Sequence, residues 1–185
     1  MSSDRIARQL QEQLFGEREC GVYAVLDGAS VPRLRWALWE HAPEHVCLYR
    51  GELEPDMATV APYLVALRPD EAFTQWALQK GWGNNWGIFA GAPVGITFRD
   101  IRRHFRQFLL VKDAEGKPLY FRYYDPRVLQ AFAPTCNRKE LRVLFGPVAW
   151  YVAETRGGAA AVRLSLAEGL LRTETIELQR AVMEV

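Results

Sequence analysis

The fold is decided at Phe121-Arg122-Tyr123-Tyr124-Asp125-Pro126-Arg127-Val128-Leu129, where an aromatic strand runs into the start of a helix. Alternate residues from Leu119 to Tyr124 place aromatic side chains on both faces, which predicts a strand covered on both sides. Asp125 stands at an N-cap position. Pro126 takes the first helical position, where a missing N–H removes no hydrogen bond. We therefore predict that a helix begins at Pro126.

The carboxylate in this stretch has two interpretations. Asp125 with Arg122 or Arg127 would suit a small enzyme that uses a catalytic acid. The same residues would equally form a helix cap held by neighbouring guanidiniums, which stabilises a helix by about 1 kcal/mol. No second catalytic group stands beside Asp125 in the sequence. We therefore favour the cap and assign Asp125 and Pro126 as a structural motif without catalytic residues.

Composition limits the class of protein. A chain of 185 residues suits one domain, or one domain with a small lobe. Its formal net charge of +1 argues against a dedicated nucleic-acid binder. The three cysteines, Cys20, Cys47 and Cys136, are far apart and odd in number, which favours reduced thiols in the cytoplasm. We find no signal peptide or membrane span in the sequence, so we expect a cytoplasmic protein without a membrane partner.

Helical and strand patterns mix along the chain without steady alternation. This favours an α+β fold with a mixed β-sheet and flanking helices. A division near residue 95 would separate an N-terminal α/β lobe from a C-terminal helix and hairpin lobe. We expect an N-terminal helix within 1–18, a central domain over 19–155, and a C-terminal β-hairpin and tail over 156–185. Within the central domain, residues 109–124 read as an antiparallel hairpin.

Thr97 with Asp100, and Asn137 with Glu140, show the spacing of helix N-caps, which predicts that two further helices begin there.

Several local patterns make sharper predictions. After Pro32, one stripe of leucines and one of tryptophans, Trp36 and Trp39, give a helix that is apolar over most of its circumference. Such a helix is predicted to be buried or to make contacts on two sides. Residues 52–56 are predicted to form an acidic loop. Gly81 is placed after a helix over 70–80, in the left-handed conformation. His104 lies among arginines and is predicted to face solvent.

Two groups of residues are candidates for partner binding. Trp82 and Trp86 lie in a glycine- and asparagine-rich loop, which would either pack them on the body or present them to a partner. A helix carries four arginines on one predicted outer face: Arg99, Arg102, Arg103 and Arg106. That face would be solvated and locally neutralised, or set against an acidic partner surface, with phosphate a more distant alternative.

Other chemistry is poorly supported by the sequence. The glycines at 81 and 83 follow a helix and precede a strand, which is the reverse of a phosphate-binding order. His41, His45 and Cys47 lack a fourth metal ligand at a typical spacing. Cys136 has no recognisable activating neighbour, and no serine lies in a nucleophile elbow. We expect no metal and no cofactor.

With these segments assembled, the sequence resembles a bacterial family of small adaptor chaperones for type VI secretion effectors, once filed as a domain of unknown function. The resemblance spans roughly residues 20–150. It is carried, in order, by Tyr23-Ala24-Val25-Leu26-Asp27-Gly28-Ala29, Leu48-Tyr49-x-Gly51-Glu52, Ala61-Pro62-Tyr63-Leu64-Val65, Gly81-Trp82-Gly83 with Trp86-Gly87, Arg102-Arg103-His104, the stretch 121–129, Pro134-Thr135-Cys136 and Phe145-Gly146-Pro147.

The resemblance implies a cytoplasmic adaptor without enzymatic activity. Such a protein holds the N-terminal region of a toxic effector and promotes its loading onto VgrG, the spike tip protein. On this hypothesis the central domain is the adaptor domain, and the segments outside it select the cargo. The expected partner-binding residues are Trp82, Trp86, Arg99, Arg102, Arg103, Arg106, Tyr124 and Arg127. The alternatives are the enzyme based on Asp125 and a nucleic-acid-binding module built on the arginine helix.

Overall fold

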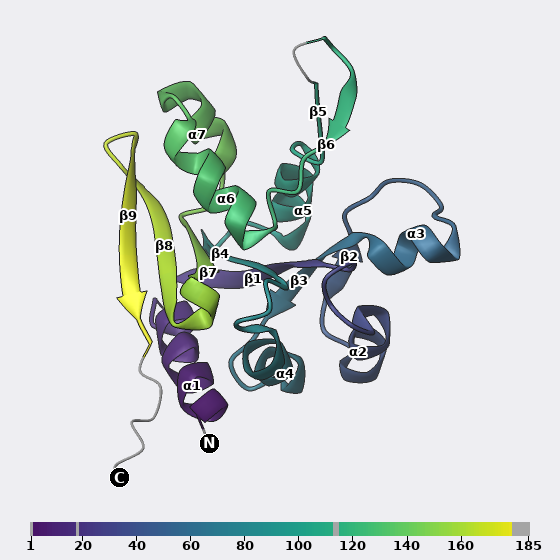
Figure 1. The fold of residues 1–185 in the computed structure, drawn as a ribbon, viewed down its shortest axis with the longest axis vertical. Helices are drawn as coiled ribbons and strands as arrows, with labels where there is room; N and C mark the ends of the chain where they lie inside the picture. Colours follow the sequence, from purple (N-terminus) through teal and green to yellow (C-terminus); the bar gives the residue numbers. More distant parts are fainter. Residues whose placement is uncertain (1, 18, 113–114, 179–185) are drawn as a thin grey trace.

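A seven-stranded sheet organises the molecule (Figure 1). The structure is a computed structural model and describes residues 2–17, 19–112 and 115–178. The strand order is β2-β3-β1-β4-β7-β8-β9, and every pairing described is antiparallel. The strands are β1 Cys20–Asp27, β2 His45–Cys47, β3 Pro62–Leu67, β4 Gly87–Pro93, β7 Trp150–Thr155, β8 Ala160–Ala167 and β9 Leu170–Glu177.

The α+β class is therefore confirmed, with one correction. The sheet is antiparallel in all of its described pairings, where a mixed sheet was predicted. The connections explain this, because the chain reverses its direction between strands that lie next to each other in the sheet. Tight turns reverse it between β7 and β8 and between β8 and β9, and connections that contain helices reverse it between β1 and its neighbours β3 and β4.

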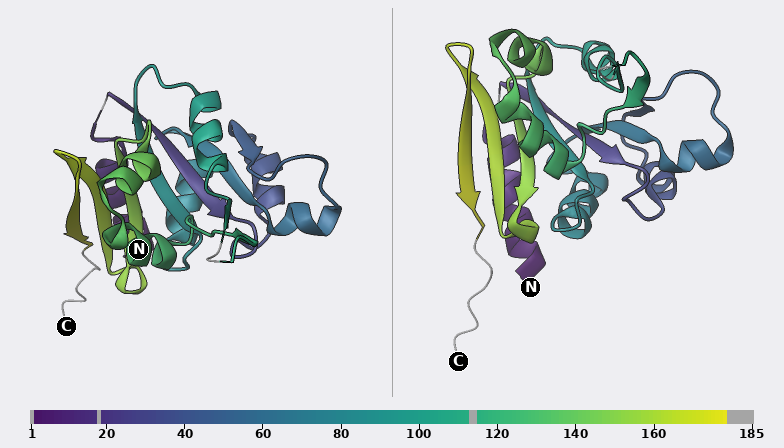
Figure 2. Two further views of the ribbon diagram at one scale, coloured as in Figure 1. Left: turned by 90° about the horizontal axis from the view of Figure 1, so that it is seen from above. Right: turned by 45° about the horizontal axis from the view of Figure 1, so that its top comes forward.

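Helices cover both faces of the sheet (Figures 1 and 2). One face carries α1 Ser2–Phe15, α2 Leu34–His41 and α4 Ala72–Gly81. The other carries α5 Phe98–Arg106, α6 Pro126–Phe132 and α7 Arg138–Phe145. The remaining elements are the short helix α3 Pro55–Val60, the strands β5 Leu110–Lys112 and β6 Pro118–Tyr120, and the 3₁₀ turns η1 Ala133–Thr135 and η2 Arg156–Gly158.

Strand β1 shows why two layers form. Val22, Ala24 and Leu26 belong to the core under α1, α2 and α4. Tyr23 and Val25 belong to the core under α5, α6 and α7. Because successive side chains of a strand point to opposite faces, an apolar run makes both faces hydrophobic and both must be covered. The chain changes from one face to the other near residue 95, while the sheet continues through the pairing of β4 with β7.

The predicted helix starts are confirmed. Pro126 is the first residue of α6, and the Asp125 side chain accepts a hydrogen bond from the Arg127 backbone N–H at 2.9 Å. Thr97 and Asp100 form a capping box at α5, and Asn137 caps α7. The N-terminal helix docks on the body, with four buried apolar residues facing α4 and the sheet: Ile6, Ala7, Leu10 and Leu14.

Other local predictions are wrong. Strand β6 ends at Tyr120, and the chain leaves it to bury Tyr123, whose hydroxyl donates to the Phe105 carbonyl at 3.0 Å. The acidic segment 52–56 contains the start of helix α3, because Pro55 opens a helical turn. Gly81 belongs to the last turn of α4, where the Trp86 ring lies over it and leaves no room for a side chain.

Helix α2 is buried on one side only. Leu34 and Leu38 are buried, as their stripe predicts, but the tryptophan stripe faces solvent. Trp36 is 45% exposed and Trp39 is 77% exposed. The helix lies at the rim of its layer, so no further element covers its second stripe (Figure 1).

His104 is buried, and not solvent-facing as predicted. Only 4% of its surface is exposed, because its side chain extends from α5 toward the end of α7 and is covered there. Its Nε2 lies 3.1 Å from the Leu144 carbonyl oxygen and 3.4 Å from the Tyr151 hydroxyl. Burial lowers the pKa of His104 to about 4, although the bond to Leu144 opposes this shift. His104 is therefore a neutral connector inside the core.

We predict that this histidine makes stability depend on pH. The pKa of His104 is about 6.5 in an unfolded chain and about 4 in the fold, so the unfolded chain binds a proton that the folded one does not. The contribution of neutral His104 to the free energy of unfolding is complete above about pH 6.5. It is lost as the pH falls toward about 4, which lowers the free energy of unfolding by about 3 kcal/mol in all. Urea unfolding at the two ends of this range should show a smaller pH dependence for His104→Phe than for the wild type.

A matched control is His45→Gln, since His45 is an exposed histidine of β2. That variant should keep the wild-type pH dependence. Equal pH dependence in the wild type and His104→Phe would show that His104 does not titrate between the folded and unfolded states.

Candidate interaction surface

A two-stranded hairpin projects from the body beside α5 (Figure 1). Among the described residues, strands β5 and β6 pair only with each other, with Leu110 opposite Tyr120 and Val111 opposite Leu119. These four side chains are exposed: Leu110 by 57%, Val111 by 38%, Leu119 by 50% and Tyr120 by 60%. Since directly paired residues share a face, each face of the hairpin carries one apolar pair.

An apolar groove runs between the hairpin and helices α6 and α7. Its volume is about 280 Å³. Phe121 and Phe132 form one wall, with ring centres 4.8 Å apart in an edge-to-face contact. The lining residues are Phe108, Val111, Phe121, Phe132, Lys139, Glu140, Val143 and Leu144. We call this the apolar groove.

A second groove lies where β5 and β6 meet α3 and the loop after β2. It has a volume of about 190 Å³ and is lined by Leu48, Tyr49, Arg50, Leu53, Met57, Arg106, Leu109, Leu110 and Tyr120. The Arg106 guanidinium is fixed here, because it donates to the carbonyls of Cys47, Leu48 and Tyr49 at 2.9, 3.1 and 3.1 Å. Tyr49 and Tyr120 close the groove with ring centres 5.3 Å apart. We call this the basic groove.

Together the hairpin and the rims of its grooves form one exposed apolar region. We call it the hairpin surface and define it by Met57, Leu110, Val111, Leu119, Tyr120, Phe132 and Val143, each at least 37% exposed. Soluble monomers seldom expose contiguous apolar patches unless these contact another molecule. The arrangement of this surface therefore suits the binding of another polypeptide.

The carboxylate of the stretch 121–129, that of Asp125, has a structural role. Asp125 is 5% exposed, and its oxygens accept from the Arg127 backbone N–H, from Nε at 3.0 Å and from the guanidinium at 2.7 Å. Burial acts to raise the pKa of Asp125, but the hydrogen bonds from Arg127 outweigh it and the pKa is lowered. Arg122 binds a different carboxylate, that of Asp27.

Asp27 is a site residue that the sequence analysis missed. It is 1% exposed at the end of β1, where it accepts from the Ala29 N–H at 3.0 Å and from the Ser30 hydroxyl at 2.8 Å. The sequence indicated only that Asp27 and Gly28 could form a turn. Nothing local indicated that Arg122, 95 positions later, would close the ion pair.

The tryptophan loop is held against the body. Trp82 Nε1 donates to the Gly158 carbonyl at 3.0 Å, and the Trp86 ring packs on Trp76 at 4.9 Å. Buried Glu154 accepts from the N–H groups of Gly83 and Asn85 at 2.7 and 2.8 Å. Burial raises the pKa of Glu154 against the effect of these bonds. Of the two interpretations of this loop, packing is the one that the geometry supports.

The four arginines of α5 do not share one outer face. Arg99 and Arg103 are exposed, and Arg103 pairs with Asp100 at 3.0 Å. Arg102 is half-buried, and Arg106 turns into the basic groove. Tyr124 is only 3% exposed and Arg127 is tied to Asp125, so the structure places neither residue on the hairpin surface.

One family model matches the chain, the Domain of unknown function (DUF4123), over residues 22–143. This covers well over half of the chain. The chain belongs to the DUF4123 family. No curated protein and no solved structure matches it.

The DUF4123 match runs from β1 into α7. It contains the hairpin and nearly all of both grooves, with Leu144 of the apolar groove just beyond its end. It leaves out α1 and the strands β7, β8 and β9, which lie outside the matched residues. The hairpin surface is therefore built almost wholly from the segment that defines the family.

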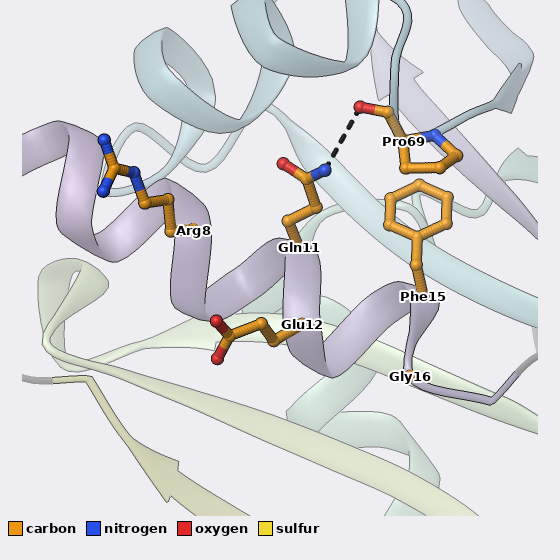
Figure 3. Close-up of a pocket in the computed structure, with 6 residues that line it drawn as sticks. All are labelled: Arg8, Gln11, Glu12, Phe15, Gly16 and Pro69. Carbon is orange, nitrogen blue, oxygen red and sulfur yellow. Dashed lines mark hydrogen bonds between the residues drawn. The ribbon is translucent and has the colours of Figure 1, made fainter.

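A further cavity lies elsewhere in this DUF4123 protein, between α1 and the end of β3 (Figure 3). Its volume is about 480 Å³. Gln11 donates to the Pro69 carbonyl at 3.2 Å and accepts from Gln75 at 2.7 Å, so these amides are already paired. Arg8 and Glu12 bring opposite charges to its rim. These two charges balance, so the rim of the cavity carries no net charge.

Metal sites and membrane-spanning helices are both absent from the part of the chain that is described. No group of three or more His, Cys, Asp or Glu side chains there could hold a metal ion. His45 instead contacts the Pro43 carbonyl at 2.8 Å, away from Cys47. Among the helices of residues 2–17, 19–112 and 115–178, none has the length and apolar character needed to cross a bilayer.

We predict that Asp125 acts as a cap. Asp125→Ala should lower the free energy of unfolding by about 1–2 kcal/mol, because α6 loses its cap and the Arg127 side chain loses its carboxylate partner. Asp125→Asn should lower it by less, since asparagine caps helices as well as aspartate does. Chemical denaturation of the three proteins measures this order. An alanine variant as stable as the wild type would refute the capping role.

Proposed function

We propose that this protein is a cytoplasmic adaptor chaperone. It binds the N-terminal region of a type VI secretion effector and promotes its loading onto the spike tip protein VgrG. The observation that carries this proposal is the hairpin surface. Seven large apolar side chains stay exposed around two grooves, in a chain that buries both faces of its central strands.

The shape of this surface suits a polypeptide better than a small molecule. The two grooves are open and lie on opposite faces of a thin hairpin, so a ligand held by both must extend around it. Aromatic side chains form part of each groove and offer large rigid contact area at low entropic cost. An unfolded effector segment would supply the apolar side chains that fill them.

The partner class comes from the resemblance to effector adaptor chaperones. Membership of the DUF4123 family supports the proposal, since the matched segment builds almost all of the hairpin surface. The parts outside the match, α1 and the C-terminal strands, lie at one end of the sheet (Figure 1). They lie away from the hairpin (Figure 1), so we assign them no part in holding the effector segment that binds there.

An adaptor that joins two proteins needs two separate surfaces. Helix α2 supplies a second one on the other face of the sheet (Figure 1). Trp36 and Trp39 are exposed there, and the Arg33 guanidinium lies 4.7 Å from the centre of the Trp36 ring. We assign the hairpin surface to the effector and the α2 tryptophans to the spike.

The observed contacts do not favour the two alternative functions. In the enzyme hypothesis Asp125 would exchange protons, yet both of its oxygens are bound by Arg127. In the nucleic-acid hypothesis the arginine helix would face phosphate, yet Arg106 turns inward and Arg103 pairs with Asp100. Neither arrangement presents a free reactive group.

We predict that the hairpin leucines determine effector binding. The double substitution Leu110→Ser and Leu119→Ser removes one exposed apolar side chain from each face of the hairpin. It should weaken binding of the N-terminal region of the effector encoded beside this gene by about tenfold or more, since two apolar contacts are lost. Co-expression, pull-down and calorimetry on the purified pair measure the change.

The matched control is Leu170→Ser with Val94→Ser. Both residues are at least 51% exposed and lie outside the hairpin surface. This control should bind the effector as the wild type does. Equal weakening in both double variants, or no binding of any neighbouring effector by the wild type, would refute the proposed function.

We predict a separate effect of α2. Trp39→Ala should weaken capture of the spike protein and leave effector binding unchanged, because α2, which carries Trp39, covers the opposite face of the sheet from the hairpin (Figure 1). The fold should be unaffected, since this ring is mostly in solvent. Pull-down of each partner alone separates the two interfaces. Loss of effector binding in this variant would contradict the assignment.

A further inference from the structure

The basic groove combines an apolar lining with unbalanced positive charge. Seven of its nine lining residues are Leu, Met or Tyr, and the other two are Arg50 and Arg106. Neither Asp nor Glu lines it among the described residues. Glu52 and Glu54 belong to the same loop but are exposed outside the lining. A groove of this kind attracts a segment that is both apolar and negatively charged.

Arg106 gives this charge a fixed position. Its three hydrogen bonds to the carbonyls of residues 47–49 hold the guanidinium between α5 and the loop after β2. These acceptors are neutral, so they satisfy its N–H groups without cancelling its charge. The positive potential therefore persists in the groove whether or not a ligand is present.

The charges of Arg102 and Arg50 act on the Arg106 guanidinium. Burial lowers the pKa of Arg106, and the neighbouring charges of Arg102 and Arg50 lower it further. Within residues 2–17, 19–112 and 115–178, no carboxylate is among the charges that act on Arg106. Two guanidiniums, those of Arg50 and Arg106, thus line the groove, and Arg50 reaches it on an exposed side chain.

We propose that the basic groove binds a segment of the effector that carries apolar side chains and a carboxylate, with Arg50 pairing the carboxylate. This inference rests on the proposed function and adds the chemistry of the bound segment. Leu53, Met57 and Leu110 hold the apolar side chains of the segment. Arg50 is the residue suited to a two-pronged contact with the carboxylate, since its guanidinium can donate two parallel hydrogen bonds.

A protein segment fits this groove better than a nucleic acid does. Phosphate backbones need a broad basic track, whereas two arginines here border an apolar floor. A carboxylate on an apolar helix or extended peptide uses both properties together. Nucleic acid is therefore the competing outcome in the test.

The experiment measures binding of overlapping peptides from the N-terminal region of the neighbouring effector. Peptides that combine Asp or Glu with large apolar residues should bind, and their versions with Lys in place of the acid should bind about tenfold more weakly. Arg50→Glu should weaken the acidic peptide about tenfold or more and favour its Lys version. Binding of the acidic peptide to the wild type should weaken as salt is raised, and this dependence should shrink in Arg50→Glu.

Arg172→Glu is the matched control, because Arg172 is an exposed arginine on β9, far from the groove (Figure 1). It makes the same charge change and should leave peptide binding as in the wild type. Unchanged peptide binding in Arg50→Glu, or a single-stranded oligonucleotide that displaces the acidic peptide, would overturn this inference.

These experiments distinguish a failure of this inference from a failure of the proposed function. If the Leu110→Ser and Leu119→Ser variant loses the effector while Arg50→Glu keeps it, the proposed function stands and the groove chemistry is wrong. If the wild type binds neither the effector nor any of its peptides, both are wrong.

Discussion

The constraint on which the rest of the structure depends is the burial of both faces of the central strands. Val22, Ala24 and Leu26 of β1 need one layer of helices, and Tyr23 and Val25 need another. A sheet with two apolar faces cannot be stable with one face in water. The chain must therefore build α1, α2 and α4 on one side and then cross to build α5, α6 and α7 on the other.

The hairpin follows from that crossing. Helix α5 must be connected to α6 across the second face, and the connection extends away from the sheet as β5 and β6. A two-stranded hairpin has little intrinsic stability in water, and this one pairs with no other strand. Exposing Leu110, Leu119 and Tyr120 on it adds nothing to the core. A partner that covers them gives these side chains a physical role that the isolated fold does not.

The sequence predicted what short-range chemistry controls. The caps at Asp125, Thr97 and Asn137 depend on neighbouring residues, so their spacing was sufficient. The tryptophan stripe of α2 and the burial of His104 were mispredicted because exposure depends on which element lies opposite. An apolar stripe has the same period whether it faces a core or solvent.

The candidate site shows the same limit. A hairpin over 109–124 was predicted, but alternating apolar residues could not reveal that both of its faces stay open. The arginines of α5 look equivalent by helical spacing. Only the position of the chain after β2 separates Arg106, which finds three carbonyls, from Arg103, which finds Asp100.

Arg106 also links stability to recognition. Its guanidinium joins the helix layer to the edge of the sheet at β2, so its position is set by folding and not by a ligand. A charge already held in place loses little conformational entropy when a partner binds. Arg50 is exposed and remains free to adjust to the partner's carboxylate. One fixed and one adaptable guanidinium, side by side, would let a single groove accept acidic segments that differ in sequence.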